Sequence, residues 1–200
     1  AVGKSALEAN TTGTRNNAVG AIALDANTTG SYNNAFGYNS LGGNTTGAEN
    51  VSMGDNALAS NSTGANNTAL GTSTLSFNTT ASNNTAVGHA ALNANTTGSA
   101  NVAVGRSALD ALTTGGNNIA IGESAGGAIT TGIRNVCIGQ SAGDHSPSLT
   151  TGNYNVVIGA YAEPTAVDAN FAIAIGYDVS GAGGYTTVGQ QTTDIRAQHG

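Results

Sequence analysis

Residues 84–105 read NTAVGHAALNANTTGSANVAVG, and this stretch contains one complete unit of a repeat. An Ala-Val-Gly motif ends at Gly88 and again at Gly105, which sets the length of the unit. Between the two, Thr-Thr-Gly ends at Gly98, and an asparagine follows at Asn101. Helical repeats have periods above about 30 residues, and two glycines in each unit oppose a helix. The unit therefore favours short strands joined by turns.

The same spacing recurs along the whole chain. The motif glycine, or that of a close variant, occurs regularly at Gly3, Gly20, Gly37, Gly54, Gly71, Gly88, Gly105, Gly122 and Gly139 and then, at unequal intervals, at Gly159, Gly176 and Gly189. Apolar runs such as 102–104 and 119–121 precede these glycines, as short strands do on entering a turn. We therefore predict an all-β parallel β-solenoid (β-roll) of about twelve 17-residue coils, stacked ~4.8 Å apart.

The repeat divides one solenoid domain, residues 1–200, into three parts. Residues 1–139 form regular coils, residues 140–189 form irregular coils, and residues 190–200 lack the motif and are interpreted as an exit segment. Three additional residues near 144–148 predict a loop that leaves the stack. Glu163 and Pro164 are interpreted as replacing a Thr-Thr-Gly turn.

Stacking explains why one residue type recurs at each position of the unit. Two apolar rows are expected, one of the residues before the motif glycines, such as Val87 and Val104, and one of leucines such as Leu92. The leucine becomes Gly126 and Gly143 in two later coils, while the position three residues further on changes from Asn to a large apolar residue. We interpret this as a core swap that keeps the buried volume roughly constant. The recurring asparagines predict ladders of stacked amides.

Composition and charge exclude several classes of function. Five Lys and Arg against 11 Asp and Glu give a net charge of −6, and no basic run could neutralise a row of phosphates, so we expect no nucleic-acid partner. No stretch approaches the ~18 consecutive apolar residues of a transmembrane helix. The single cysteine, Cys137, excludes an internal disulfide framework.

The sequence offers no catalytic or metal-binding constellation. No acidic residue lies between Asp55 and Asp110, so the middle of the rod lacks a carboxylate pair for glycoside hydrolysis. His89, His145 and His199 have no partner at the spacing of metal ligands. We therefore predict no catalytic residue, no metal ion and no cofactor.

Two segments carry the resemblance to a known family. The repeated Asn-x-Ala-Val-Gly-x-x-Ala-Leu, and Asn-Val-Cys-Ile-Gly-Gln-Ser-Ala-Gly at residues 135–143, resemble the YadA-like, haemagglutinin-type head repeats of trimeric autotransporter adhesins. They equally resemble the long variant of these repeats in phage tail fibres, and the likeness extends over residues 1–189. It implies a left-handed β-roll, intertwined or packed as a homotrimer, that binds host surfaces and carries no catalytic residues. The unit is longer than the bacterial head repeat, which favours the phage-type fibre.

The expected function is therefore structural and adhesive. A thin coil buries few apolar side chains for each residue that it orders, which independently favours burial between chains. We expect a rigid trimeric shaft or receptor-binding segment of an extracellular phage tail fibre, with a host glycan or protein receptor and adjoining fibre segments as partners. The alternatives are the head of a bacterial trimeric autotransporter adhesin at the cell surface and, from another class, a polysaccharide-degrading tailspike.

Recognition is expected near the irregular coils. Loops on a rigid scaffold often carry binding residues, and the loop near 144–148 interrupts the stack there. Tyr154, Tyr161, Tyr177 and Tyr185 fall in the same part of the sequence. Tyrosine often contacts sugars and proteins, so this region is a candidate for recognition. The alternative is that the coils simply become irregular near the end of a domain.

Overall fold

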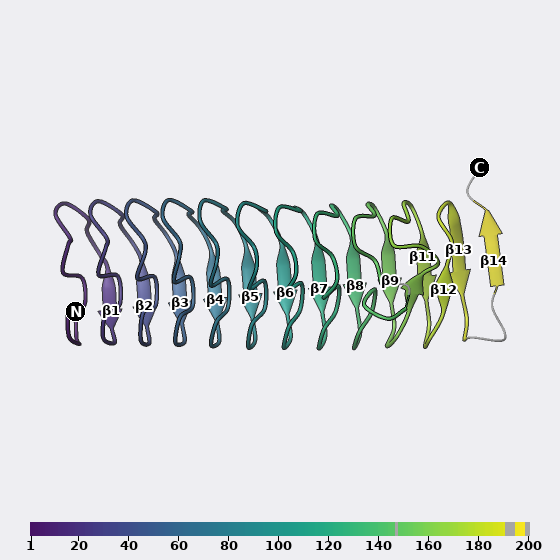
Figure 1. Cartoon of the computed structure of the whole chain (residues 1–200), viewed down its shortest axis with the longest axis horizontal. Coiled ribbons are helices and arrows are strands. Elements are labelled where there is room, and N and C mark those ends of the chain that lie inside the picture. Colours follow the sequence, from purple (N-terminus) through teal and green to yellow (C-terminus); the bar gives the residue numbers. More distant parts are fainter. Residues whose placement is uncertain (147, 191–194, 199–200) are drawn as a thin grey trace.

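A computed structural model describes residues 1–146, 148–190 and 195–198. About ten turns of roughly 17 residues stack into a long rod with the two chain ends at opposite ends (Figure 1), which confirms the all-β parallel solenoid. The strands are β1 (Asn17–Val19), β2 (Asn34–Phe36), β3 (Val51–Met53), β4 (Thr68–Leu70), β5 (Thr85–Val87), β6 (Val102–Val104), β7 (Ile119–Ile121), β8 (Val136–Ile138), β9 (Val156–Ile158), β10 (Glu163–Pro164), β11 (Ile173–Ile175), β12 (Ser180–Gly181), β13 (Tyr185–Val188) and β14 (Ile195–Gln198).

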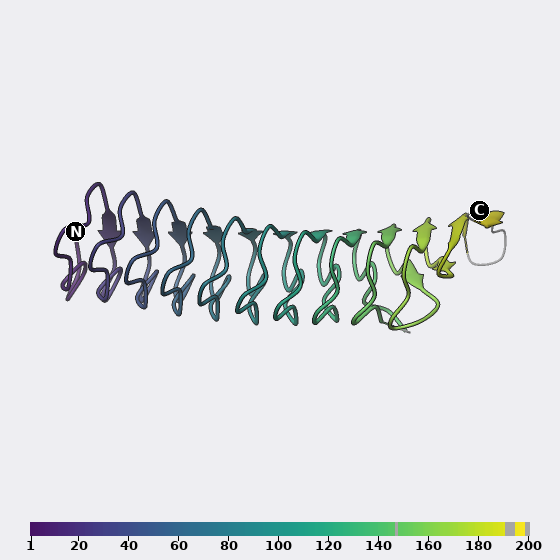
Figure 2. The ribbon, with the colours of Figure 1, turned by 90° about the horizontal axis from the view of Figure 1, so that it is seen from above.

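The strands before the motif glycines form one long parallel sheet. Its order is β1 to β9, then β11, β13 and β14, and β10 pairs with β12 in a second, two-stranded sheet. Val87 lies opposite Val104 in the register of β5 and β6, so equivalent residues of successive units are vertical neighbours, as expected. The register is also kept where the interval between motif glycines is longer or shorter than in the regular coils. Val136 pairs with Val156 across the longer interval, and Ile175 pairs with Val188 across the shorter one. Figure 2 shows the strands along one side of the rod, turning gradually as the sheet twists.

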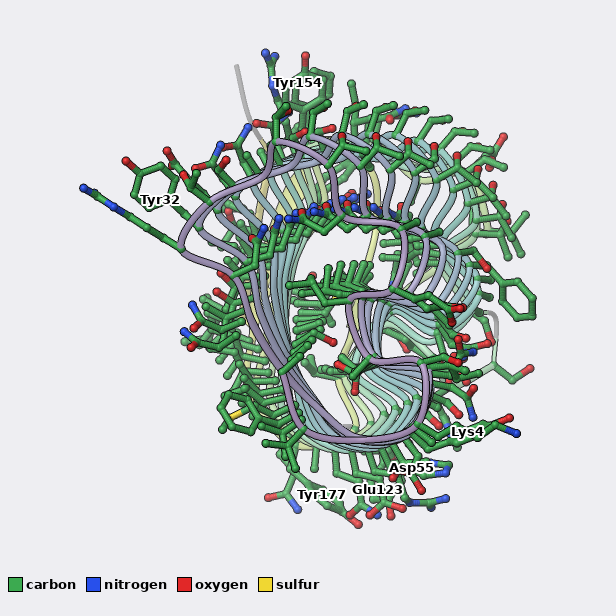
Figure 3. All side chains as sticks on the ribbon, turned by 90° about the vertical axis from the view of Figure 1, so that its left-hand side faces the viewer. Lys4, Tyr32, Asp55, Glu123, Tyr154 and Tyr177 are labelled. Atoms are coloured by element: carbon green, nitrogen blue, oxygen red, sulfur yellow. The ribbon has the colours of Figure 1, made fainter. Side chains whose placement is uncertain are left out.

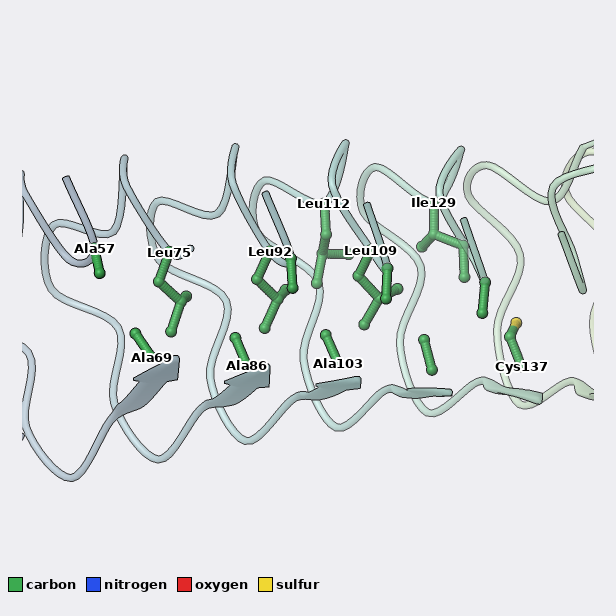
Figure 4. Close-up of a cluster of buried hydrophobic side chains, with 14 of the residues drawn as sticks. Ala57, Ala69, Leu75, Ala86, Leu92, Ala103, Leu109, Leu112, Ile129 and Cys137 are labelled. Carbon is green, nitrogen blue, oxygen red and sulfur yellow. The ribbon is translucent and has the colours of Figure 1, made fainter. Parts of the chain in front are cut away.

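Each three-residue strand turns its middle side chain inward and the other two outward, as the alternation of a strand requires. The inward residue is small, as at Ala86 and Ala103, which are fully buried. Leucines from the opposite wall, such as Leu75 and Leu92, fill the remaining space and are also fully buried (Figure 4). The row that contains Val104 is vertical as expected, but it lies on the outer face of the sheet, where Val104 is 36% exposed.

The core swap is confirmed. Leu112, Ile129 and Leu149 are fully buried. A Cβ added to Gly126 would lie 3.0 Å from Cδ2 of Leu109 and 3.1 Å from Cδ1 of Ile129. The space that a leucine would fill is therefore already occupied from the neighbouring position, as close packing requires.

Two asparagine ladders run through the interior, as expected. In the first, each Nδ2 donates to the Oδ1 of the preceding coil, for example from Asn61 to Asn44 at 2.8 Å. This ladder stops at Asn95, whose buried Oδ1 has no partner among the described residues, because the next coil carries Leu112 at that position. The second ladder includes Asn33, Asn50, Asn67, Asn84, Asn101, Asn118, Asn135 and Asn155. At Asn84 the backbone N–H, and not the side chain, donates to Oδ1 of Asn67. The ladders satisfy turn carbonyls that the thin coil buries.

The motif glycines are required by two separate constraints. Gly88 has a φ of 127°, and a Cβ there would lie 2.5 Å from the carbonyl oxygen of Gly105 in the next coil. A side chain would therefore meet both backbone strain and a direct overlap. The coils stack closely because this column has no side chains.

The irregular coils keep the sheet but change the opposite wall. Residue 147 of the expected loop lies outside the described residues. On either side of it, the N–H of Leu149 donates to the carbonyl of Gly143 at 2.9 Å, six residues back, where regular coils close over three. The interpretation of Glu163 and Pro164 as a turn is wrong, because Glu163 follows Gly159 by four residues and takes the inward leucine position. Residues 167–169 form the turn instead, since Ala169 O accepts from Nδ2 of Asn155.

The expected exit segment lies only partly within the described residues. Ile195–Gln198, which is β14, pairs antiparallel with β13, and Val188 lies opposite Ile195. Residues 191–194 and 199–200 fall outside the described residues. The described part of the segment therefore continues the sheet instead of leaving it.

Candidate functional site

The largest unusual surface is the outer face of the long sheet, which we call the sheet face. It consists of two columns, one residue and three residues before each motif glycine. Exposed apolar members include Val19, Phe36, Met53, Val104, Ile119, Ile121 and Val188, between 36% and 46% exposed. Neither column contains a charged residue between Val2 and Val188. The column one residue before the glycines is apolar throughout, and an apolar strip ~50 Å long is uncommon on a monomeric soluble protein. The other column also contains Asn17, Asn34, Thr68, Thr85 and Thr186.

A second surface feature is an aromatic column, made of Arg134, Tyr154 and Phe171. Each residue lies two positions before its strand and has a φ of 57–60°, which directs the side chain outward. The Arg134 guanidinium lies 5.3 Å from the centre of the Tyr154 ring, and its Nη1 donates to the tyrosine hydroxyl at 2.6 Å. Tyr154 and Phe171 stack at 5.1 Å with an interplanar angle of 10°. The column is therefore a stack of parallel planes along the rod.

The tyrosines of the irregular coils lie in more than one surface cluster. Tyr161 contacts Tyr177 edge-to-face at 5.9 Å and His145 at 5.5 Å, whereas Tyr154 stacks on Phe171. Figure 3, which looks along the rod, shows Tyr154 and Tyr177 pointing outward from opposite sides. Sequence reasoning missed His145 and Phe171 as ring partners. The position of each tyrosine within the repeat unit would have predicted this difference. Tyr154 follows a Thr-Thr-Gly turn, whereas Tyr177 follows a motif glycine, and these two positions lie on different sides of the coil.

Two acidic side chains approach each other in a way that the sequence analysis also missed. Asp110 and Asp144 share one column, and Gly127 lies in the coil between them. A Cβ on Gly127 would lie 2.9 Å from Oδ2 of Asp144 and 3.3 Å from Oδ1 of Asp110. Desolvation by burial raises the pKa of both carboxyls, and the charge of Asp110 raises the pKa of Asp144 further. In the sequence, the feature that indicates this approach is the separation of the two aspartates by two repeat units.

Replacing Asp144 with asparagine is expected to stabilise the protein at pH 7 by less than about 1 kcal/mol, since both groups keep contact with solvent. A carboxyl whose pKa is higher in the folded state than its ordinary value of 3.8 binds its proton more tightly when folded. Stability of the native protein therefore rises as pH falls through the folded-state pKa, and the benefit of D144N disappears below about pH 4. Urea unfolding at several pH values measures this difference. The exposed Asp168→Asn is the control, and equal pH profiles for D144N and the native protein would contradict the prediction.

Glu163 is a buried acid at the inward leucine position. It is 7% exposed. Ser180 Oγ donates to its Oε1 at 3.4 Å, and Oε2 has no hydrogen-bond partner among the described residues. Burial raises the pKa of the Glu163 carboxyl, and this effect is larger than the opposite effect of the nearby His145, which lowers the pKa. Burial therefore penalises the charged form of this carboxyl.

The described residues contain no helix that could cross a membrane. Over residues 1–146, 148–190 and 195–198, there is also no group of three or more His, Cys, Asp or Glu side chains that could hold a metal ion, and the described surface has no pocket. Cys137 is buried, and desolvation raises the pKa of its thiol to about 12. The thiol is therefore unreactive in the folded protein.

Comparison with known family models, with curated proteins and with solved structures finds no match for this chain. The fold thus stands on the geometry described above. The family suggested by residues 135–143 stays a proposal.

Proposed function

We propose that this chain is a rigid segment of an extracellular trimeric fibre, either the shaft or a receptor-binding part of a phage tail fibre. The observation that carries the proposal is the uncharged apolar sheet face. On this face the large apolar side chains point outward and the small ones point inward. This arrangement is better explained if a second layer of protein covers the face than if water does. Three copies with parallel rods would turn these faces toward a common axis.

Closed association of this kind suits a parallel solenoid. Each coil orders about 17 residues around a core of small side chains, so burial between chains adds stability at every level of the rod. The head of a bacterial adhesin would use the same face, and it is the alternative within the same class. The repeated close glycine contacts and the asparagine ladders favour a mechanical role, because they fix the spacing of adjacent coils.

The expected mass of the native protein in solution is three times the 19.4 kDa of one chain, measured by sedimentation equilibrium. The double variant V104E/I121E places two carboxylates on the sheet face, and we expect it to reduce the mass to that of one chain because charge burial without a partner is unfavourable. The matched control is T97E/T114E, which adds the same charges to exposed turn residues of adjacent coils and should leave the assembly intact.

Two outcomes would contradict the proposal. The first is a native protein that stays monomeric at micromolar concentration. The second is a V104E/I121E variant that retains the native mass.

A further inference from the structure

The aromatic column stops abruptly at Phe171, and its end is uncovered. The next coil, between Gly176 and Gly189, is shorter than the regular unit. Ile173 pairs with Thr186. Phe171 lies two residues before Ile173 and Gly184 lies two residues before Thr186, so Gly184 is the next residue in the column. Gly184 has a φ of 75°, as this position requires, but it has no side chain. A Cβ added there would have no atom within 4 Å.

Among the described residues, only Tyr154 stacks on the Phe171 ring, and its outer face has no ring partner. Phe171 is 57% exposed, although its other face is covered by the parallel ring of Tyr154. The Arg134 contact and the tyrosine hydroxyl hold the stack in place. A ring fixed in this way loses little conformational freedom on binding a ligand, which favours affinity.

Polar residues precede Phe171 in the same turn. Asn170 precedes Phe171, and its Oδ1 accepts from the backbone N–H and Nδ2 of Asn153 at 3.0 and 3.1 Å. Its Nδ2 donates to the carbonyl of Asp168 at 2.8 Å, and the Asp168 side chain is exposed. The turn thus combines one flat apolar face with carboxamide and carboxylate groups that can bind hydroxyls.

We infer that the open face of Phe171 binds one pyranose ring of a saccharide, with Asn170 and Asp168 as hydrogen-bonding partners of its hydroxyls. The aliphatic hydrogens of such a ring carry partial positive charge and complement the negative face of an aromatic ring. A single ring face is far smaller than the roughly 800 Å² per partner of a stable protein interface. The inference rests on the proposed adhesive function and specifies the receptor as a glycan.

The test uses the native protein and three probes: methyl β-galactopyranoside, methyl α-mannopyranoside and methyl β-N-acetylglucosaminide. Saturation-transfer NMR should show transfer from aromatic protons to the hydrogens on one face of at least one probe. Phe171→Ala should weaken that binding by at least about tenfold, which corresponds to roughly 1.4 kcal/mol. Gly184→Leu should have a similar effect, because it covers the ring without altering Phe171.

The matched control is Phe77→Ala. Phe77 is 56% exposed but belongs to a regular coil and has no ring partner among the described residues. We expect this variant to bind within about twofold of the native protein. Melting curves of all three variants confirm that they are folded.

The outcomes separate this inference from the proposed function. If no probe binds, or if binding survives both Phe171→Ala and Gly184→Leu, the saccharide site is wrong even when the protein is a trimer. If a probe binds in the expected way to a monomeric protein, the site stands and the trimeric fibre is wrong.

Discussion

Replacing Gly37 with alanine is expected to lower the free energy of unfolding by about 3 kcal/mol or more. The φ of Gly37 is 134°, in a region that side chains avoid at a cost of order 1–3 kcal/mol. The new Cβ would also lie 2.6 Å from the carbonyl oxygen of Gly54, so the two coils would have to separate. Urea unfolding followed by circular dichroism measures the loss.

Gly43→Ala in the same coil is the matched control. Gly43 does not have a positive φ. A Cβ there would approach Ala59 O at 2.8 Å, but the equivalent residues of the adjacent coils, Ala26 and Ser60, already carry one. We expect a change within about 1 kcal/mol. Equal effects of the two substitutions would show that the glycine column is not a contact between coils.

The second large effect is expected for Asn61→Asp. Asn61 Nδ2 donates to Oδ1 of Asn44 at 2.8 Å and to the carbonyl of Gly64 at 3.0 Å, and its Oδ1 accepts from Asn78 at 2.8 Å. Aspartate keeps the shape and the acceptor but loses both donors. Asn44 Oδ1 then faces another oxygen in a buried ladder. We expect the free energy of unfolding to fall by about 3 kcal/mol or more at pH 7.

Acid should partly reverse the effect of Asn61→Asp, because a protonated carboxyl can donate one hydrogen bond. Asn66→Asp in the same coil is the control: Asn66 is exposed, and its substitution should change stability by less than about 0.5 kcal/mol. Thermal unfolding at pH 7 and pH 4 separates these results. A stable N61D protein at pH 7 would mean that the ladder contributes little.

The sequence predicted the stacking register because several independent contacts require the same period. The glycine column, the asparagine ladders and the leucine row are satisfied together only when equivalent residues of successive units lie over each other. Phe36 and Met53 illustrate what the pattern did not predict: large apolar residues are usually expected inside, but the inward positions of these two strands hold the small residues Ala35 and Ser52. The period alone does not distinguish the two faces of a strand.

The candidate sites were harder to predict, because they depend on single residues that depart from the repeat and, at the end of the aromatic column, on a shortened coil. Asp144 and Asp110 meet across a glycine, so neither has an acidic neighbour one unit away. The exposed end of the aromatic column exists because the next coil lacks four residues and carries Gly184 there. The pattern places Glu163 in a turn because three additional residues in the preceding coil shift the spacing. Its position four residues after Gly159 is that of the inward leucine.

The stacking of residues one unit apart is tested most directly by a disulfide between adjacent coils. Thr97→Cys with Thr114→Cys places the two Cα atoms ~4.8 Å apart in the stack, within the Cα–Cα range that a disulfide spans. Thr97→Cys with Thr131→Cys separates them by two coils, ~10 Å, and is the control. The native Cys137 does not interfere, because its buried thiol has a pKa of about 12.

Mild oxidation followed by mass spectrometry of peptides is the measurement. We predict an intrachain disulfide in the T97C/T114C protein and free thiols in the T97C/T131C protein. A disulfide in the second protein but not in the first would contradict a coil that is one repeat unit long.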